Sequence, residues 1–184
     1  MYKRQRYPYS CLEQVTSKAV GMSDATLWQS TMGQLPSYLD GDGLASYFPL
    51  AGDGSGRAAR GSDTLTAHLL NLSALAQGVD KRFVLPAAER ERMENGLIAF
   101  VEGRIQRSFW SPRKDLDMRK LAAIQALALT GRANPRMLDS ITIAPNDWPT
   151  HAVIDWVALL KHMRELPQRE QQLAQAQQLS LIHI

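Results

Sequence analysis

The stretch SDTLTAHLLNLSALAQG, residues 62–78, decides the fold class of this chain. Ser62 and Asp63 are favourable N-cap residues, and Gly78 is a common residue at a helix end. Between them, apolar residues recur at the three- and four-residue spacing of one helix face. They are Leu65, Leu69, Leu72 and Ala76. The pattern predicts an amphipathic α-helix whose apolar face lies on a core.

Further helices are predicted in the next part of the chain. Pro86 can occupy the first position of a helix that runs to about Ile105. Asp115 begins another, which ends at Thr130-Gly131 and is followed by a short helix after Asn134-Pro135. Their apolar positions are again spaced for burial on one face. They are Met93, Leu97, Phe100 and Val101 in the first, and Leu121, Ile124 and Ala128 in the second.

The C-terminal part predicts one more pair of helices and a foreign tail. Asn146-Asp147 and Pro149 begin a helix, and a Gln-rich helix follows Pro167. The inward residues of the first are Val153, Trp156, Val157 and Leu160. The apolar residues 179–184 break from this composition and resemble the in-frame translation of a transposon-end sequencing adapter. We therefore expect residues 1–178 to form the domain and residues 179–184 to be a non-native tail from a truncated reading frame.

The stretch before residue 62 is predicted to be a loop. Turn-forming residues crowd the sequences DGDG at residues 40–43 and GDGSG at residues 52–56. Neither Asp40 nor Asp53 starts the alternating oxygen ligands and final glutamate of an EF-hand. Turn chemistry is therefore the better interpretation than calcium binding.

These patterns together predict an all-α fold. Strand-like alternation is almost absent, and no heptad seam is long enough for a coiled coil. The 184 residues suit one domain, and 45% hydrophobic with 21% charged residues is ordinary for a soluble protein. We expect a row of helical hairpins joined by short loops in a layered α/α arrangement.

The charge and hydropathy of the chain indicate no nucleic-acid or membrane partner. The formal net charge is only +3, and the arginines and lysines between Arg104 and Lys120 fit an exposed helix surface. No apolar run approaches the ~20 residues that cross a bilayer. The basic start at residues 1–6 lacks the apolar stretch of a signal peptide.

Chemistry is concentrated in the sequence YPYSCLEQ, residues 7–14, at a predicted helix start. Cys11 is the only cysteine, so its thiol is inert, assists a metal site or is reactive. Gln14 lies three residues later, and residues i and i+3 share one face of a helix. The Cys11 sulfur can therefore reach the Gln14 side-chain carbonyl and displace ammonia to form a thioester. A bare Cys-x-x-Gln would fit an ordinary buried cysteine equally well.

A thioester survives only where water and amines are kept away from it. Tyr7 and Tyr9 supply aromatic surface beside the bond, and Pro8 stiffens the approach. Once this protection is lost, a lysine amine can attack the Gln14 carbonyl, form an amide and release the Cys11 thiolate. The chain would then be attached covalently to its target.

The octet resembles the thioester signature Tyr-Pro-Tyr-Gly-Cys-x-Glu-Gln of bacterial α2-macroglobulins. Ser10 stands in place of the usual glycine, and Glu13 matches the motif without an assigned chemical step. Residues 42–49 are similar to the family's Asp-Gly-Gly-Phe-x-x-Trp-Pro turn, and residues 62–68 to the start of its Thr-Ala-Tyr helix. The stretch 148–156 is similar as well.

The resemblance implies that residues 1–178 are about the first half to two-thirds of a thioester domain, whose fold is an α/α toroid. It assigns the thioester to Cys11 and Gln14 and shielding to Tyr7, with Tyr9 a weaker candidate. Residues 103–120 hold none of the histidines that accept the acyl group in some complement relatives, so it implies direct attack by lysine amines.

The resemblance also implies a biological setting. The parent protein would be a monomeric, lipid-anchored inhibitor in the periplasm of a Gram-negative bacterium, trapping proteases without turnover. Its partners would be those proteases and its own further domains, and no cofactor is expected.

Two alternatives remain open from the sequence. The chain is an inactive fragment, or it is an α/α-toroid enzyme acting on isoprenoid or sugar substrates. Asp115 and Asp117 are a poor match to the acidic motif of terpene cyclases, and helix capping explains them better. His151 and His162 lack partners for a metal set, and His68 fits a helix-surface or half-buried residue. We predict no metal.

Overall fold

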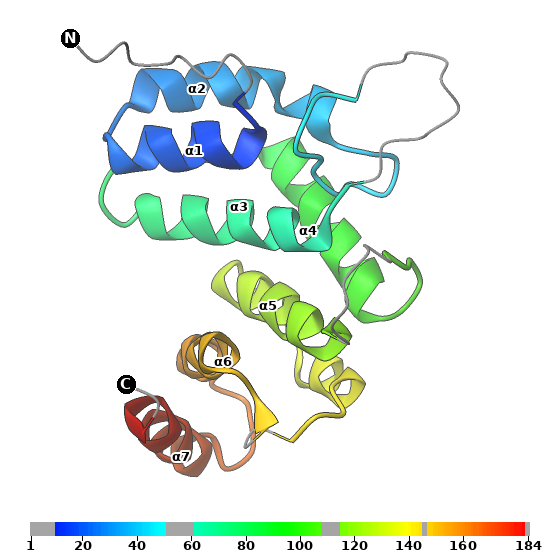
Figure 1. The fold of residues 1–184 in the computed structure, drawn as a ribbon, viewed down its shortest axis with the longest axis vertical. Helices are drawn as coiled ribbons and strands as arrows, with labels where there is room; N and C mark the ends of the chain where they lie inside the picture. Colours follow the sequence, from blue (N-terminus) through cyan, green and yellow to red (C-terminus); the bar gives the residue numbers. More distant parts are fainter. Residues whose placement is uncertain (1–9, 51–60, 108–114, 145–146, 183–184) are drawn as a thin grey trace, which may run out of the picture.

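The computed structural model describes residues 10–50, 61–107, 115–144 and 147–182, which form an all-α fold (Figure 1). The elements are α1 (Leu12–Gly21), α2 (Ala25–Gln34), η1 (Leu35–Tyr38), α3 (Asp63–Ala76), α4 (Ala87–Val101), α5 (Leu116–Leu129), η2 (Pro135–Ser140), α6 (Thr150–His162) and α7 (Arg169–Ile182). Within the described residues the only β-type pairing is an isolated bridge between Leu39 and Ala45. The predicted all-α class is confirmed.

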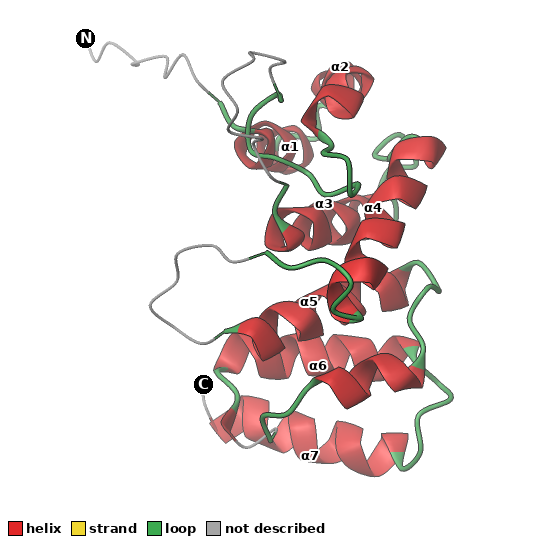
Figure 2. Ribbon diagram, turned by 90° about the vertical axis from the view of Figure 1, so that its right-hand side faces the viewer, coloured by secondary structure: helices red, strands yellow, loops and turns green. Residues whose placement is uncertain are grey.

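The helices are arranged as consecutive hairpins that pack in chain order. Helix α1 packs on α3, α3 on α5, and α5 on α6. Each of these helices also contacts the helical segment that follows it, which is α2, α4, η2 or α7 respectively. Figure 2 shows this succession from α1 and α2 at one end of the molecule to α6 and α7 at the other.

The central helices begin and end close to their predicted positions. The Ser62 hydroxyl accepts the Leu65 backbone N–H at 3.2 Å, which caps α3 as its sequence indicated. Helix α4 ends at Val101, four residues before the predicted end, because Gly103 follows it with φ +76°. Gly131, two residues after the last residue of α5, has φ +73°. In both places a left-handed glycine stops the helix.

Helix α2 was not predicted, although it carries one of the largest buried side chains. Trp28 is fully buried, packs edge-to-face on Phe83 with 5.6 Å between ring centroids, and donates its indole N–H to the Val84 carbonyl. The Asp24 carboxylate caps the helix by accepting the Leu27 N–H at 2.9 Å. Trp28 therefore fastens α2 to the segment between α3 and α4.

The DGDG segment is a turn held by its own carboxylate, as predicted. Asp40 Oδ1 accepts the backbone N–H groups of Asp42 and Leu44, and Asp40 Oδ2 accepts that of Gly61. Gly43 has φ +83°, a conformation that glycine adopts without strain. These bonds bring the two ends of the loop together next to the start of α3.

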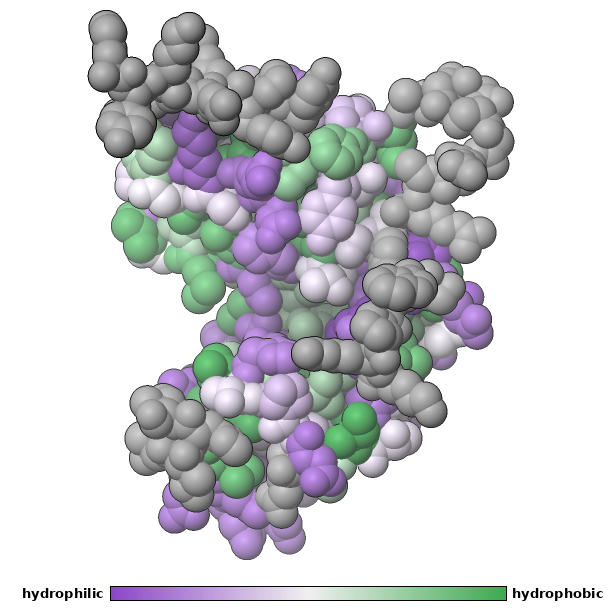
Figure 3. All heavy atoms as spheres, in the orientation of Figure 1, coloured by the Kyte–Doolittle hydropathy of each residue, from purple (hydrophilic) through white to green (hydrophobic). Residues whose placement is uncertain are grey.

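One hydrophobic cluster runs through the described part of the chain, from Leu12 on α1 to Ala176 on α7. On the face drawn in Figure 3, apolar and polar residues are interspersed among the described residues. None of the described helices combines the length and the apolar character needed to cross a membrane. Helix α7 continues to Ile182, so the predicted boundary after residue 178 falls inside a helix.

Candidate functional site

Cys11 is the N-cap residue of α1, the helix that carries the candidate site. Its backbone is extended, with φ −73° and ψ 163°. The Leu12 N–H donates to the Tyr47 carbonyl at 2.9 Å. This bond joins the start of α1 to the loop between η1 and α3.

The structure brings Cys11 and Gln14 into reciprocal contact. Gln14 Oε1 accepts the Cys11 backbone N–H at 3.3 Å, and the Cys11 side chain faces the Gln14 backbone N–H. This is the geometry of a capping box, in which the first and fourth residues of a helix start satisfy each other's backbone donors. The two side chains therefore share one side of the first turn, as their spacing predicted.

This contact is suited to acyl chemistry at the Gln14 amide. Attack by the Cys11 sulfur on Gln14 Cδ moves negative charge onto Oε1. That oxygen already accepts the Cys11 N–H and lies at the positive end of the helix dipole. A donor aimed at the oxygen where charge develops lowers the barrier to such an attack.

The described residues cover this site only in part. Cys11 is half-buried, whereas Ser10, Glu13 and Gln14 are exposed. The predicted shielding residues Tyr7 and Tyr9, with Pro8 between them, lie outside the described residues. Within the described part of the chain, solvent reaches the Gln14 side chain.

Tyr47 is an aromatic neighbour of the site that the sequence analysis missed. Burial raises the pKa of its hydroxyl, negative charge on Glu13 and Cys11 raises it further, and the hydrogen bond with Ser62 lowers it. Its backbone carbonyl adjoins the site by accepting the Leu12 N–H, and the residue is 37% exposed. The sequence signal that could have identified Tyr47 is its position within residues 42–49, which resemble a turn motif of the bacterial α2-macroglobulins.

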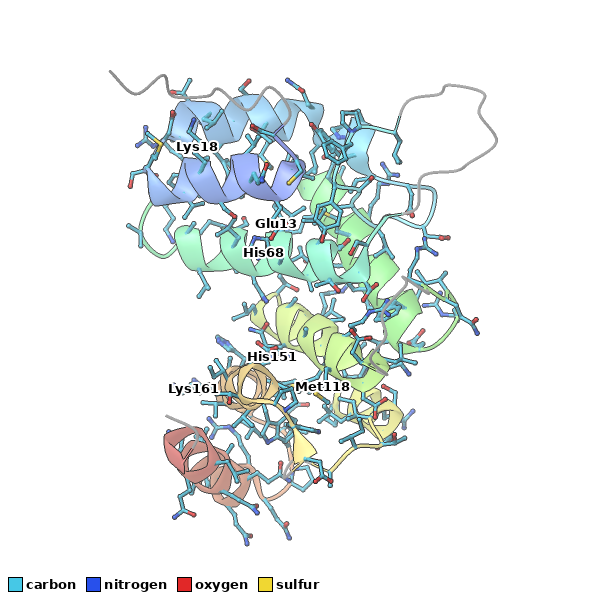
Figure 4. The ribbon with its side chains drawn as sticks, in the orientation of Figure 1. Glu13, Lys18, His68, Met118, His151 and Lys161 are labelled. Carbon is cyan, nitrogen blue, oxygen red and sulfur yellow. The ribbon has the colours of Figure 1, made fainter. Side chains whose placement is uncertain are left out.

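His68 lies on α3 beside the same helix. Its Nε2 is 3.4 Å from the Ser17 hydroxyl, and the residue is half-buried, as expected. Figure 4 shows Glu13 and His68 on the facing sides of α1 and α3. A polar seam of Glu13, Ser17 and His68 thus follows the contact between the two helices.

Asp115 and Asp117 have structural partners. The Asp117 carboxylate accepts the Thr142 N–H and hydroxyl, both at 2.7 Å, and the Ile143 N–H at 2.9 Å. Burial alone would raise the pKa of Asp117, but these bonds outweigh it and hold the pKa below its ordinary value. Asp115, at the N-cap position of α5, lies 3.9 Å from the Arg119 guanidinium. Both carboxylates lie at the start of α5, but Asp115 makes no side-chain cap hydrogen bond, and Asp117 instead joins α5 to the Thr142–Ile143 segment.

No metal cluster is evident in the part of the chain that the structure describes. His151 and His162 are exposed near opposite ends of α6. No group of three or more histidine, cysteine, aspartate or glutamate side chains among the described residues is placed to hold a metal ion.

The expectation of an exposed basic surface between Arg104 and Lys120 is wrong at two positions. The Arg107 side chain is 6% exposed and pairs with Asp40 and Asp42 at 2.8 and 2.6 Å. The Arg119 side chain is 14% exposed and pairs with the fully buried carboxylate of Asp63 at 2.6 Å. These partners are more than fifty residues away in sequence, so charge patterning along one helix could not reveal them.

The site is therefore a Cys11–Gln14 pair at a helix N-terminus, next to Tyr47 and the polar seam. Comparison with family models, with curated proteins and with solved structures finds no match to this chain.

Proposed function

We propose that Cys11 and Gln14 form an internal thioester, and that the chain is part of a covalent protease trap similar to the bacterial α2-macroglobulins. The observation that carries the proposal is the capping box of Cys11 and Gln14, in which each side chain contacts the backbone N–H of the other residue and Gln14 Oε1 accepts the Cys11 N–H. The resemblance of residues 7–14 to the family's thioester signature supports it independently.

Thioester formation needs only the groups at this site. Cys11 Sγ bonds to Gln14 Cδ, the bond from Cδ to Nε2 breaks, and the nitrogen leaves as ammonia with the thiol proton. The reaction requires no oxidant or cofactor. The product is a reactive acyl group held at the start of α1.

Capture then requires a nucleophile from the target. A neutral lysine amine of an attacking protease bonds to Gln14 Cδ, and the bond from Cδ to Cys11 Sγ breaks. The amine proton passes to the released thiolate. The protease is joined by an amide and the group is consumed, so the trap inhibits without turnover.

The helix arrangement supports a toroidal parent domain. Helices α1, α3, α5 and α6 pack in succession, and each carries the next helical segment beside it. An α/α toroid repeats this pattern around a ring, so further helices would continue the row beyond α6 and α7. We propose that these helices, the remaining domains and a periplasmic lipid anchor belong to a monomeric parent protein.

A second candidate is an inactive fragment, and one observation favours it. Gln14 is exposed and Cys11 is only half-buried among the described residues. A thioester in such a setting meets water, which attacks it and leaves a glutamate at position 14 with a free thiol. Trapping by this chain therefore depends on protection from Tyr7, Tyr9 or another domain.

Intact mass and thiol titration of the freshly purified chain separate these candidates. We expect a mass lower than the sequence by one ammonia and no free thiol, with methylamine restoring one thiol and adding its own mass. The Cys11→Ser variant is the control and should keep the full sequence mass. A full sequence mass with a free thiol in the wild-type chain would show that it carries no thioester.

A further inference from the structure

The helix period places one lysine of α1 on the same side as Gln14, which supplies the acyl carbon of the proposed thioester. Lys18 follows Gln14 by one turn of α1, so the two side chains lie about 40° apart around the helix axis. Cys11, the N-cap residue, is on the same side of the first turn as Gln14 because each side chain contacts the backbone of the other residue. Figure 4 shows Lys18 and Glu13 on opposite sides of α1, which places Lys18 away from the seam with α3.

The Lys18 amine is available for reaction. Both Gln14 and Lys18 are exposed, and no ion pair among the described residues involves Lys18. Side chains at i and i+4 have their Cβ atoms roughly 5–6 Å apart. The flexible four-carbon stem of lysine spans this distance, so Nζ can approach Gln14 Cδ without unwinding the helix.

We propose that Lys18 is an internal acyl acceptor that consumes the thioester when no target captures it. Neutral Nζ bonds to Gln14 Cδ, the bond from Cδ to Cys11 Sγ breaks, and the amine proton passes to the leaving sulfur. The product is an amide bridge between Gln14 and Lys18 with a free Cys11 thiol. This inference rests on the proposed function, because it starts from the thioester.

Proximity favours this route over hydrolysis and over stray amines. A nucleophile held one helical turn from its electrophile reacts with a high effective concentration, whereas external amines must first collide with the site. Only the neutral amine attacks, so the rate increases with pH. The bridge would leave an activated but unused trap unable to couple to bystander proteins.

The test follows wild-type and Lys18→Arg chains from purification, without added amine, by intact mass, thiol titration and tryptic mapping. Arginine keeps the charge and the helix preference but does not form the amide. In the wild-type chain we expect a free thiol to appear while the mass stays one ammonia below the sequence. Because acylated Lys18 resists trypsin, residues 7–57 should appear as one peptide.

The variant should behave differently. In Lys18→Arg the thiol should appear only as the chain gains one water, and trypsin should cut after position 18. Lys81→Arg, which changes another exposed lysine, is the matched control and should follow the wild-type course.

Two other outcomes would overturn the inference in distinct ways. If the wild-type chain loses ammonia and then gains water at the rate of Lys18→Arg, self-acylation is wrong and the thioester stands. If neither chain ever loses ammonia, the thioester does not form, and both proposals fail.

Discussion

Tyr47 is the aromatic residue that the structure places beside the reactive pair. Its carbonyl accepts the first N–H of α1, and the negative charges of Glu13 and Cys11 help to raise the pKa of its hydroxyl. Tyr47→Ala should therefore shorten the lifetime of the thioester several-fold, because it opens one side of the bond to water. The rate of thioester loss is measured in the Lys18→Arg background. It is the rate at which the form whose mass is one ammonia below the sequence disappears.

Tyr47→Phe is the matched control for this prediction. It removes the hydroxyl but keeps the ring, so the lifetime should stay close to that of the parent chain. Equal lifetimes for the alanine and phenylalanine variants would show that the ring does not protect the thioester.

Asp155 on α6 is a carboxylate whose environment favours the neutral form. Burial raises its pKa, and the positive charge of His151 only partly opposes this. The folded state is therefore penalised wherever Asp155 is ionised, and the penalty fades as pH falls through the raised pKa. Asp155→Asn should increase the free energy of unfolding at neutral pH, with a difference that disappears below the ordinary aspartate pKa.

Denaturant unfolding at several pH values tests the predicted direction of the change in the free energy of unfolding. The exposed Asp139→Asn on η2 is the control and should show a much smaller difference at neutral pH. A stability gain for Asp155→Asn that grows as pH falls would contradict the argument.

At the scale of elements, α4 and the DGDG turn meet through two glycines. A Cβ on Gly96 of α4 would lie 2.6 Å from the Asp42 carbonyl oxygen, and one on Gly43 would lie 2.3 Å from that of Arg92. Helix propensity favours alanine over glycine by up to ~1 kcal/mol. The atoms that the new Cβ would meet belong to the backbone, which cannot move aside as the end of a flexible side chain can. Despite the favourable helix propensity of alanine, we therefore expect Gly96→Ala to lose about 1–3 kcal/mol of stability.

Gly33 of α2 provides the matched control for this prediction. A Cβ there meets nothing within 4 Å, so Gly33→Ala should be neutral or stabilising by up to ~1 kcal/mol. Chemical denaturation of both variants gives the comparison. A stable Gly96→Ala would mean that the turn can move away from α4 at little cost.

The sequence predicted the elements whose signals are local. Helices α3, α4 and α5 have apolar residues at helical spacing, and this periodicity together with their start and stop residues located them. Helix α2, with the sequence ATLWQSTMGQ, was missed although the contrast between its faces is no weaker than that of α4 or α5, and its place in the fold depends on the burial of Trp28 against Phe83. Its cap Asp24 was the available signal.

The candidate site likewise combines features that local sequence predicts with features that depend on tertiary packing. The facing of Cys11 and Gln14 follows from their spacing on one helical turn, so the sequence was sufficient. Tyr47 and His68 reach the site only through the packing of the loop and α3 against α1. The pairing of Arg107 and Arg119 with distant aspartates likewise depends on tertiary contacts.

At the scale of the whole molecule, α5 joins the two ends of the described chain. It packs on α3 and α4 on one side and on α6 and η2 on the other, within one continuous core. A mutation at its centre should therefore destabilise every hairpin together, since small single-core domains unfold cooperatively.

Ile124, fully buried on α5, is the residue that tests this coupling. Ile124→Ala should cost about 2–5 kcal/mol, and hydrogen exchange should lose protection equally in α3 and α6. The control is Ile154→Ala on α6, where the side chain is 56% exposed and the same truncation should have a small effect. If Ile124→Ala weakened α6 and α7 while α1 to α4 kept their protection, the hairpins would be separate cooperative units. The start of α1, and with it the Cys11–Gln14 pair, would then depend on the first two hairpins alone.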